Sequence, residues 1–68
     1  MKRSVIEVKP SKGGGWQAKI RENGKFVIVN NNKAKVISVA RQTARDLGHS
    51  RLIIKKANGH IQTESTYE

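Results

Sequence analysis

Residues 16–30 read WQAKIRENGKFVIVN, and this stretch decides the fold. Residues 16–21 alternate between apolar and polar side chains, which is typical of a strand that buries one face. Asn23-Gly24 is the strongest short signal for a two-residue turn, in which both residues take a positive φ. Residues 25–30 return as the second strand. The stretch therefore predicts a β-hairpin, around which the rest of the chain can be placed.

A two-residue turn also predicts which side chains share a face of the hairpin. Ile20 is expected opposite Val27, and Ala18 is expected opposite Val29. Together with Trp16, these residues form the expected core side of the hairpin. The other face is expected to hold Phe26, Ile28, Lys19 and Arg21.

Residues 33–47 follow the hairpin with the periodicity of an amphipathic helix. Asn32 is the expected N-cap, because its side chain can accept a hydrogen bond from the first helical turn. Gly48 stands where a helix commonly ends, since glycine adopts the left-handed conformation without a steric penalty. The side chains that fall in one arc form the predicted core stripe: Val36, Ile37, Val39, Ala40, Thr43, Ala44 and Leu47.

Three further strands are expected around the hairpin and the helix. Residues 4–9 precede the hairpin and are rich in β-branched side chains. Residues 51–56 and 60–66 follow the helix and meet at a second Asn-Gly turn. The order of three strands, one helix and two strands (β-β-β-α-β-β) predicts an α+β fold. We expect one small domain over residues 1–68, an antiparallel sheet with the single helix packed on one face.

The net charge indicates the kind of partner. Among 68 residues, 14 are Lys or Arg and only 5 are Asp or Glu, which gives a formal net charge of +9. Residues 1–35 carry a net +7 and residues 36–56 a net +4, whereas residues 57–68 carry −2. Such an excess favours a polyanionic partner, nucleic acid before an anionic membrane. The alternative is that the charge serves solubility alone.

The composition excludes several classes of protein and site. The chain has no cysteine, so disulfides, thiolate zinc sites and cysteine nucleophiles are excluded. The longest apolar run, residues 26–29, is too short for a transmembrane helix or a signal peptide, and we expect a cytoplasmic location. His49, His60 and the scattered carboxylates show no metal-ligand or catalytic spacing. We therefore expect no enzyme activity, metal, cofactor, small-molecule substrate or membrane contact.

Two basic surfaces are candidates for contact with nucleic acid. On the predicted outer face of the hairpin, Phe26 can stack on a base while neighbouring cations hold phosphates. On the helix, Arg41 and Arg45 lie four residues apart and therefore share a face. The predicted nucleic-acid-binding residues are Lys19, Arg21, Lys25, Phe26, Arg41 and Arg45, with supporting charge from Lys9, Lys12, Lys33 and Lys35.

The expected function is non-catalytic binding of DNA or RNA, mainly through phosphate contacts and with low sequence specificity. An interpretation from another class is a protein–protein interaction module, such as a phage or host regulator. Its interface would be an apolar patch of Phe26, Ile28 and Ile53 rimmed by cations. Homodimerisation belongs to this alternative, because a chain below about 70–80 residues gains stability from a second copy.

Short motifs follow one another along the chain in this order: Gly15-Trp16, Lys19, Ala40-Arg41, Ala44, Gly48, Leu52-Ile53-Ile54, Asn58-Gly59-His60-Ile61 and Thr66-Tyr67. In order and spacing they resemble the domain of unknown function 2188 family of small bacterial, archaeal and phage proteins. The resemblance covers nearly the whole chain and implies an α+β fold with no known activity. The sequence departs from the family pattern at Lys35-Val36, where the family tends to have an acidic residue followed by Ala. Basic residues at a helix start oppose the helix dipole, at a cost of about 0.3–1 kcal/mol each.

Overall fold

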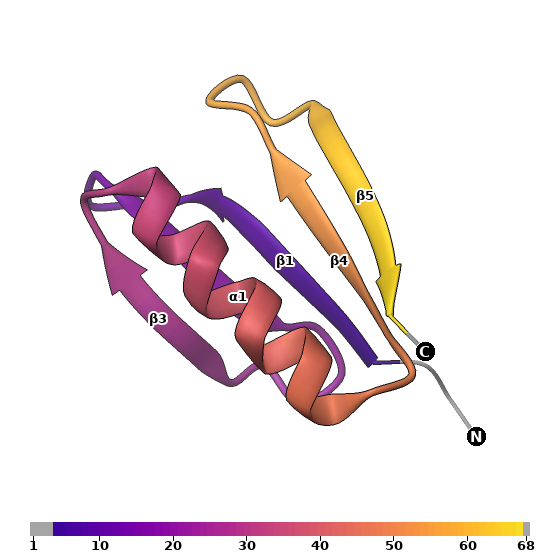
Figure 1. The fold of residues 1–68 in the computed structure, drawn as a ribbon. Helices are drawn as coiled ribbons and strands as arrows, with labels where there is room; N and C mark the ends of the chain where they lie inside the picture. Colours follow the sequence, from indigo (N-terminus) through magenta and orange to yellow (C-terminus); the bar gives the residue numbers. More distant parts are fainter. Residues whose placement is uncertain (1–3, 68) are drawn as a thin grey trace.

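The computed structural model describes residues 4–67 and contains one sheet and one helix within them (Figure 1). The elements, in chain order, are β1 (Ser4–Pro10), β2 (Trp16–Ile20), β3 (Phe26–Asn30), α1 (Lys33–Leu47), β4 (Ser50–Lys55) and β5 (Ile61–Tyr67). The predicted α+β class and order of elements are confirmed. The helix bounds agree with the prediction, and each strand end lies within one residue of it.

The sheet has the strand order β3-β2-β1-β4-β5, so β1 lies at its centre. β1 pairs antiparallel with β2 and parallel with β4, where Val5 lies opposite Arg51. The predicted antiparallel sheet with one helix is therefore confirmed, except that this one pair is parallel. The reason lies in the helix, because α1 returns along the sheet after β3 (Figure 1). β4 then runs in the direction of β1 and β3, so its pairing with either of them is parallel.

The core lies between α1 and one face of the sheet. Burial of apolar side chains in this core supplies the main driving force for folding, at about 25 cal/mol per Å² of apolar surface. The fully or nearly fully buried members are Ile6, Val8, Ala18, Val36, Ala40, Ala44, Leu52 and Ile54. The predicted helix stripe is confirmed for Val36, Ala40 and Ala44, and Ile37 packs beside them. Leu47, the last helical residue, is 49 % exposed and lies outside the core.

The turn between β2 and β3 is longer than predicted. The Ile20 N–H donates to the Lys25 carbonyl at 2.9 Å, and the Gly24 N–H donates to the Ile20 carbonyl at 3.0 Å. Residues 21–24 therefore form a four-residue turn. Gly24 has a φ of +70°, but Asn23 is not in the left-handed region, and its side chain accepts a hydrogen bond from the Lys25 N–H at 2.9 Å. The predicted turn with two positive φ values is wrong.

The longer turn, together with a bulge in β3 opposite Ala18 and Lys19, changes the faces on which two side chains of β3 lie. Ile28 lies opposite Ala18 and packs toward α1, so its predicted place beside Phe26 is wrong. Val29 lies on the other face and is 55 % exposed, although the two-residue turn placed it in the core. Phe26 lies opposite Lys19 and is 58 % exposed, as predicted. Because side chains alternate along a strand, a change of one residue exchanges the faces.

Both ends of α1 have the predicted caps. The Asn32 side chain accepts a hydrogen bond from the Lys35 N–H at 3.3 Å. Gly48 has a φ of +61°, and its N–H donates to the carbonyls of Ala44 and Arg45 at 3.1 Å each. Ser50 adds a bond that the sequence did not indicate, because its buried hydroxyl donates to the Ala44 carbonyl at 2.8 Å. The last turn of the helix is therefore tied to the start of β4.

Candidate nucleic-acid interface

One face of the sheet packs against α1, and the opposite face carries most of the strand charges. We call this second face the open face. The pairing register assigns to it Val5, Glu7, Lys9, Gln17, Lys19, Phe26, Val29, Arg51, Ile53, Lys55, Ile61, Glu64 and Thr66. Its cations outnumber its carboxylates, and Arg21 adds a further cation at the end of β2. A surface of this kind attracts anions.

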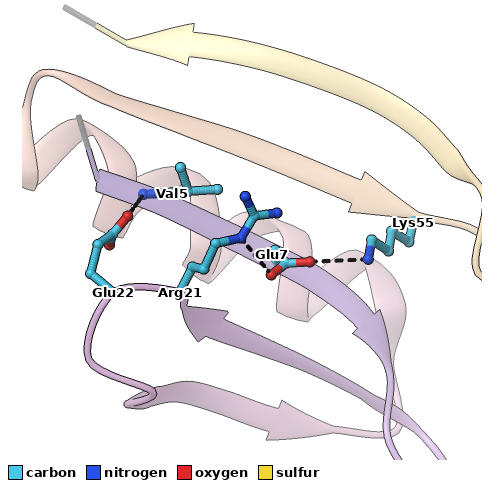
Figure 2. Close-up of polar contacts among 5 residues, drawn as sticks. All are labelled: Val5, Glu7, Arg21, Glu22 and Lys55. Atoms are coloured by element: carbon cyan, nitrogen blue, oxygen red, sulfur yellow. Dashed lines mark hydrogen bonds and ion pairs between the residues drawn. The ribbon is translucent and has the colours of Figure 1, made fainter. Parts of the chain in front are cut away.

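Glu7 neutralises part of this charge at the centre of the sheet. Its Oε1 accepts a hydrogen bond from Arg21 Nε at 3.1 Å, and its Oε2 lies 3.0 Å from Lys55 Nζ (Figure 2). The hydrogen bond from Arg21, together with that from Lys55, lowers the pKa of Glu7 from 4.5 to about 2, although partial burial acts in the opposite direction. The same bond raises the pKa of Arg21. Glu7 therefore stays ionised and holds two cations from the strands on either side.

The segment just after β2 is attached to the start of β1. The Val5 N–H donates to Glu22 Oε1 at 2.8 Å (Figure 2). The Arg21 N–H donates to the Val5 carbonyl, also at 2.8 Å. These bonds fix the backbone from which the Arg21 side chain reaches Glu7. The carboxylate of Glu22 is thus held at the start of β1.

Lys9, Lys19 and Phe26 form a different environment, which we call the β1–β3 patch. Lys19 lies opposite Phe26, and its Nζ is 5.8 Å from the centre of the exposed ring. This is within the range of a cation–π contact. Within residues 4–67, neither Lys9 nor Lys19 has a carboxylate oxygen within 4.0 Å. The patch therefore combines an accessible aromatic ring with two ammonium groups that form no salt bridge within the described residues.

The other half of the open face is more nearly neutral. Arg51 Nη1 lies 4.0 Å from Glu64 Oε1 across the β4–β5 pair, and Lys55 is held by Glu7. An exposed pair such as Arg51–Glu64 contributes only about 0–1 kcal/mol to stability. These pairs nevertheless reduce the local positive charge, because each cation of β4 has a carboxylate beside it. The unpaired positive charge of the open face is concentrated at β1 and β2.

The structure divides the predicted binding residues among several surfaces. Those on the open face or at its margin are Lys9, Lys19, Arg21 and Phe26. Lys12 and Lys25 are exposed in the loops at opposite ends of β2. The structure confirms the predicted placement of Lys19 beside Phe26, although the turn on which that prediction relied has a different length.

The predicted helix residues do not join this group. The exposed cations of α1 are Lys35, Arg41 and Arg45. They belong to the element that covers the opposite face of the sheet (Figure 1). Lys33 is engaged locally, because its Nζ lies 4.4 Å from the centre of the Trp16 ring and donates to Gln62 Oε1 at 2.8 Å.

Sequence reasoning missed three open-face residues, namely Glu7, Arg51 and Lys55. The alternation of residues 51–55 was a usable signal, since it places Arg51 and Lys55 on one face. The role of Glu7 had no local signal. Its two partners come from β2 and β4, and they meet only because β1 lies between these strands.

The part of the chain that the structure describes has no pocket. It also contains no group of three His, Asp or Glu side chains that could hold a metal ion. Its helix is not long and apolar enough to cross a membrane. The candidate site is an open, charged surface of a sheet.

Fold and surface together define a small α+β domain with one helix over a five-stranded sheet and a charged open face. The chain belongs to the domain of unknown function 2188 family, whose model, described as an uncharacterized protein conserved in bacteria, matches residues 6–67. The resemblance carried by the sequence motifs is thereby confirmed. No curated protein matched the chain. No solved structure matched it.

Proposed function

We propose that this protein binds nucleic acid through the open face, without catalysis and with low sequence specificity. The observation that carries the proposal is the β1–β3 patch, where Lys19 Nζ lies 5.8 Å from the exposed Phe26 ring. Phosphates would contact the ammonium groups while a base stacks on the ring. Phe26 is the one aromatic side chain that the described part of the open face carries. Phosphate contacts would therefore supply most of the affinity.

The open face supports this proposal better than the helix does. Lys9 and Lys19 come from the neighbouring strands β1 and β2, which lie about 4.8 Å apart and present their charges side by side. The exposed cations of α1 are Lys35, Arg41 and Arg45, and the helix has no aromatic side chain to place beside them. That surface therefore offers phosphate contacts without a ring on which a base can stack.

The test is a titration against labelled duplex DNA, single-stranded DNA and RNA at about 50 mM and about 200 mM salt. We expect binding that weakens steeply with salt, with a logarithmic slope of about −0.9 for each duplex phosphate contact. The ranking of the three ligands identifies the preferred nucleic acid. Absence of binding at the lower salt concentration would reject the proposal.

Two double variants locate the binding face. Lys9→Ala with Lys19→Ala removes two charges from the open face, and Arg41→Ala with Arg45→Ala removes two from the helix. Both variants lower the net charge from +9 to +7. We expect the open-face variant to bind about tenfold more weakly and to lose about 2 units of salt slope, and the helix variant to change less. Equal losses would show that total charge, and not the open face, determines binding.

A protein-interaction surface is the second candidate function. The structure narrows its predicted apolar patch, because Ile28 packs toward α1 and Ile53 is only 6 % exposed. Of the predicted patch only Phe26 remains exposed, and Val29, which was predicted in the core, adds a second exposed apolar side chain on the same strand. Phe26→Ser separates the two functions. Loss of capture of a protein partner with unchanged affinity for nucleic acid would favour the protein interface.

A further inference from the structure

β5 is the edge of the sheet that the helix leaves uncovered. α1 packs against β1, β2, β3 and β4 and lies away from β5 (Figure 1). Within the described residues, its hydrogen bond to β5 is the one from Lys33 to Gln62. Residues 61–64 and Thr66 are exposed, and only Ser65 and Tyr67 are half-buried. β5 pairs with β4 alone, so its outer N–H and C=O groups have no partner strand.

β5 has fewer than β3 of the features that usually keep an edge strand from pairing with another chain. Natural edges are protected by short length, bulges, proline or lysine. β3, the other edge, has five residues, a bulge and Lys25 just before it. β5 has seven residues and no Lys, Arg or Pro. Its pairing shifts only near its start, opposite Lys55, and residues 63–67 pair regularly with β4.

The charge distribution also favours β5 as the place where a second copy can approach. A chain with a net charge of +9 repels its own copies. β5 carries Glu64 and no cation, which makes it the one element of the described structure with a net negative charge. The neighbouring cations of β4 are held by Glu64 and Glu7. The nearest cation on the helix side, Lys33, donates to Gln62 of β5 itself. Lys19 lies three strands away, roughly 14 Å, which exceeds the screening length of about 8 Å at physiological salt.

We propose that β5 pairs antiparallel with β5 of a second copy of this chain and joins the two sheets into one. A two-fold axis at Ser65 aligns residues 63–67 of both copies. Glu64 then lies opposite Thr66 of the second copy, and Thr63 lies opposite its Tyr67, so no like charges meet. The contact is small, so the association is weak and becomes measurable at high chain concentration.

The arrangement has a defined geometry. An antiparallel pair related by a two-fold axis has that axis perpendicular to the sheet. Both helices then lie on one side of the joined sheet, and both open faces lie on the other. The inference rests on the strand edge and the charges around β5, and it holds whether or not the open face binds nucleic acid.

The mass of the chain in solution, measured by sedimentation equilibrium, tests this inference. We expect a rise from 7.6 kDa toward twice this value between about 10 µM and about 1 mM chain, as mass action requires. Ser65→Lys places two like charges opposite each other at the axis and should leave a monomer. Ser38→Lys makes the same change on the exposed side of α1 and should still dimerise. Both variants should keep the far-ultraviolet circular dichroism of the original chain.

A mixture of two variants separates lost pairing from lost folding. Ser65→Asp alone should also be monomeric, whereas Ser65→Asp mixed with Ser65→Lys should form a dimer, because opposite charges then face each other. Four results would overturn the proposal. They are a monomeric original chain at about 1 mM, a dimeric Ser65→Lys variant, a monomeric mixture, and a mass that grows beyond two copies through β5–β3 pairing. Dissociation by Phe26→Ser, with Ser65→Lys still dimeric, would instead place the contact on the open face.

Discussion

At the scale of single residues, Glu7 links the stability of the fold to the charge that the open face presents. It lies in the central strand and holds a cation from each neighbouring strand. Its side chain is only 14 % exposed, so the ion pairs are screened less than those at the rim. Removing this one carboxylate should therefore affect both folding and binding, in opposite directions.

The first prediction at this scale concerns acid. The pKa of Glu7 is about 2 in the folded chain and 4.5 ordinarily, so its stabilising effect is complete above about pH 5 and is lost as the pH falls toward 2. We expect this group to contribute about 1–3 kcal/mol to the free energy of unfolding at neutral pH. Urea unfolding at pH values from 2 to 7 should show a flatter pH dependence for Glu7→Gln than for the original chain. Parallel curves would contradict the assignment.

The second prediction concerns binding and rests on the proposed function. Glu7→Gln releases Arg21 and Lys55 for contact with phosphates, so affinity for nucleic acid should rise several-fold at about 50 mM salt. Glu64→Gln is the matched control, because it also removes one carboxylate from the open face but lies beside β4 and away from the β1–β3 patch. We expect a smaller gain from it. Equal gains would mean that the ligand senses only the net charge of the chain.

At the scale of elements, the loop between β1 and β2 packs closely against the segment that leads into α1. Gly15 has a φ of +76°, and a Cβ at this position would lie 2.7 Å from Asn31 Oδ1 and 3.0 Å from the Asn30 carbonyl oxygen. Gly13 has open space around it and no positive φ. The three glycines of this loop are therefore not equivalent, although the sequence shows only a run of identical residues.

The third prediction follows from this difference. Gly15→Ala should lower the free energy of unfolding by about 1–3 kcal/mol, because alanine meets both the strained φ and the close carbonyl oxygen. Gly13→Ala should be neutral or stabilise by up to about 1 kcal/mol, since it restricts the unfolded chain. Urea unfolding of the two variants measures both effects. Equal stability of the two variants would show that the loop adjusts freely.

Local sequence signals were sufficient to locate the ends of α1 but not to define the two hairpin turns. Asn32 and Gly48 located the ends of α1 because each acts through hydrogen bonds within a few residues. Asn23-Gly24 and Asn58-Gly59 marked both turns, but they did not predict the length of either. Each asparagine accepts a hydrogen bond from the N–H two residues later, so only the glycine takes a positive φ. An Asn-Gly pair fits both kinds of turn, and the face assigned to Ile28 and Val29 depended on this choice.

At the scale of the whole molecule, the fold class was predictable and the neighbours in the sheet were not. Hydrophobic periodicity was enough to place every element in order. The sheet order decided the rest of the candidate site, because Glu7 meets Arg21 and Lys55 only with β1 between β2 and β4. The parallel pairing of β1 with β4 follows from the directions of the strands alone. After a three-stranded meander and a returning helix, β4 runs parallel to both edges that it could join.

The net charge gives the two proposed contacts opposite responses to salt. Binding of nucleic acid releases counterions and weakens as salt is added. Pairing of two chains of charge +9 is opposed by repulsion, which salt screens, so dimerisation should strengthen between about 50 mM and about 500 mM salt. Repeating the sedimentation measurement at both salt concentrations checks this expectation. A dimer that dissociates as salt is added would point to an interface made of ion pairs and not to the edge of β5.

The central position of β1 also has a kinetic consequence. Ser4 lies opposite Ser50, 46 positions later in the chain (50 − 4), whereas β1, β2 and β3 are joined by short loops. Closing the larger loop costs more chain entropy, so we expect the β1–β4 pair to form late and to limit the rate of folding. During synthesis from the N-terminus, the three-stranded meander can form while β1 still waits for β4. In that interval the future centre of the sheet is an exposed edge, and it is the segment at which nascent chains are most vulnerable to mispairing.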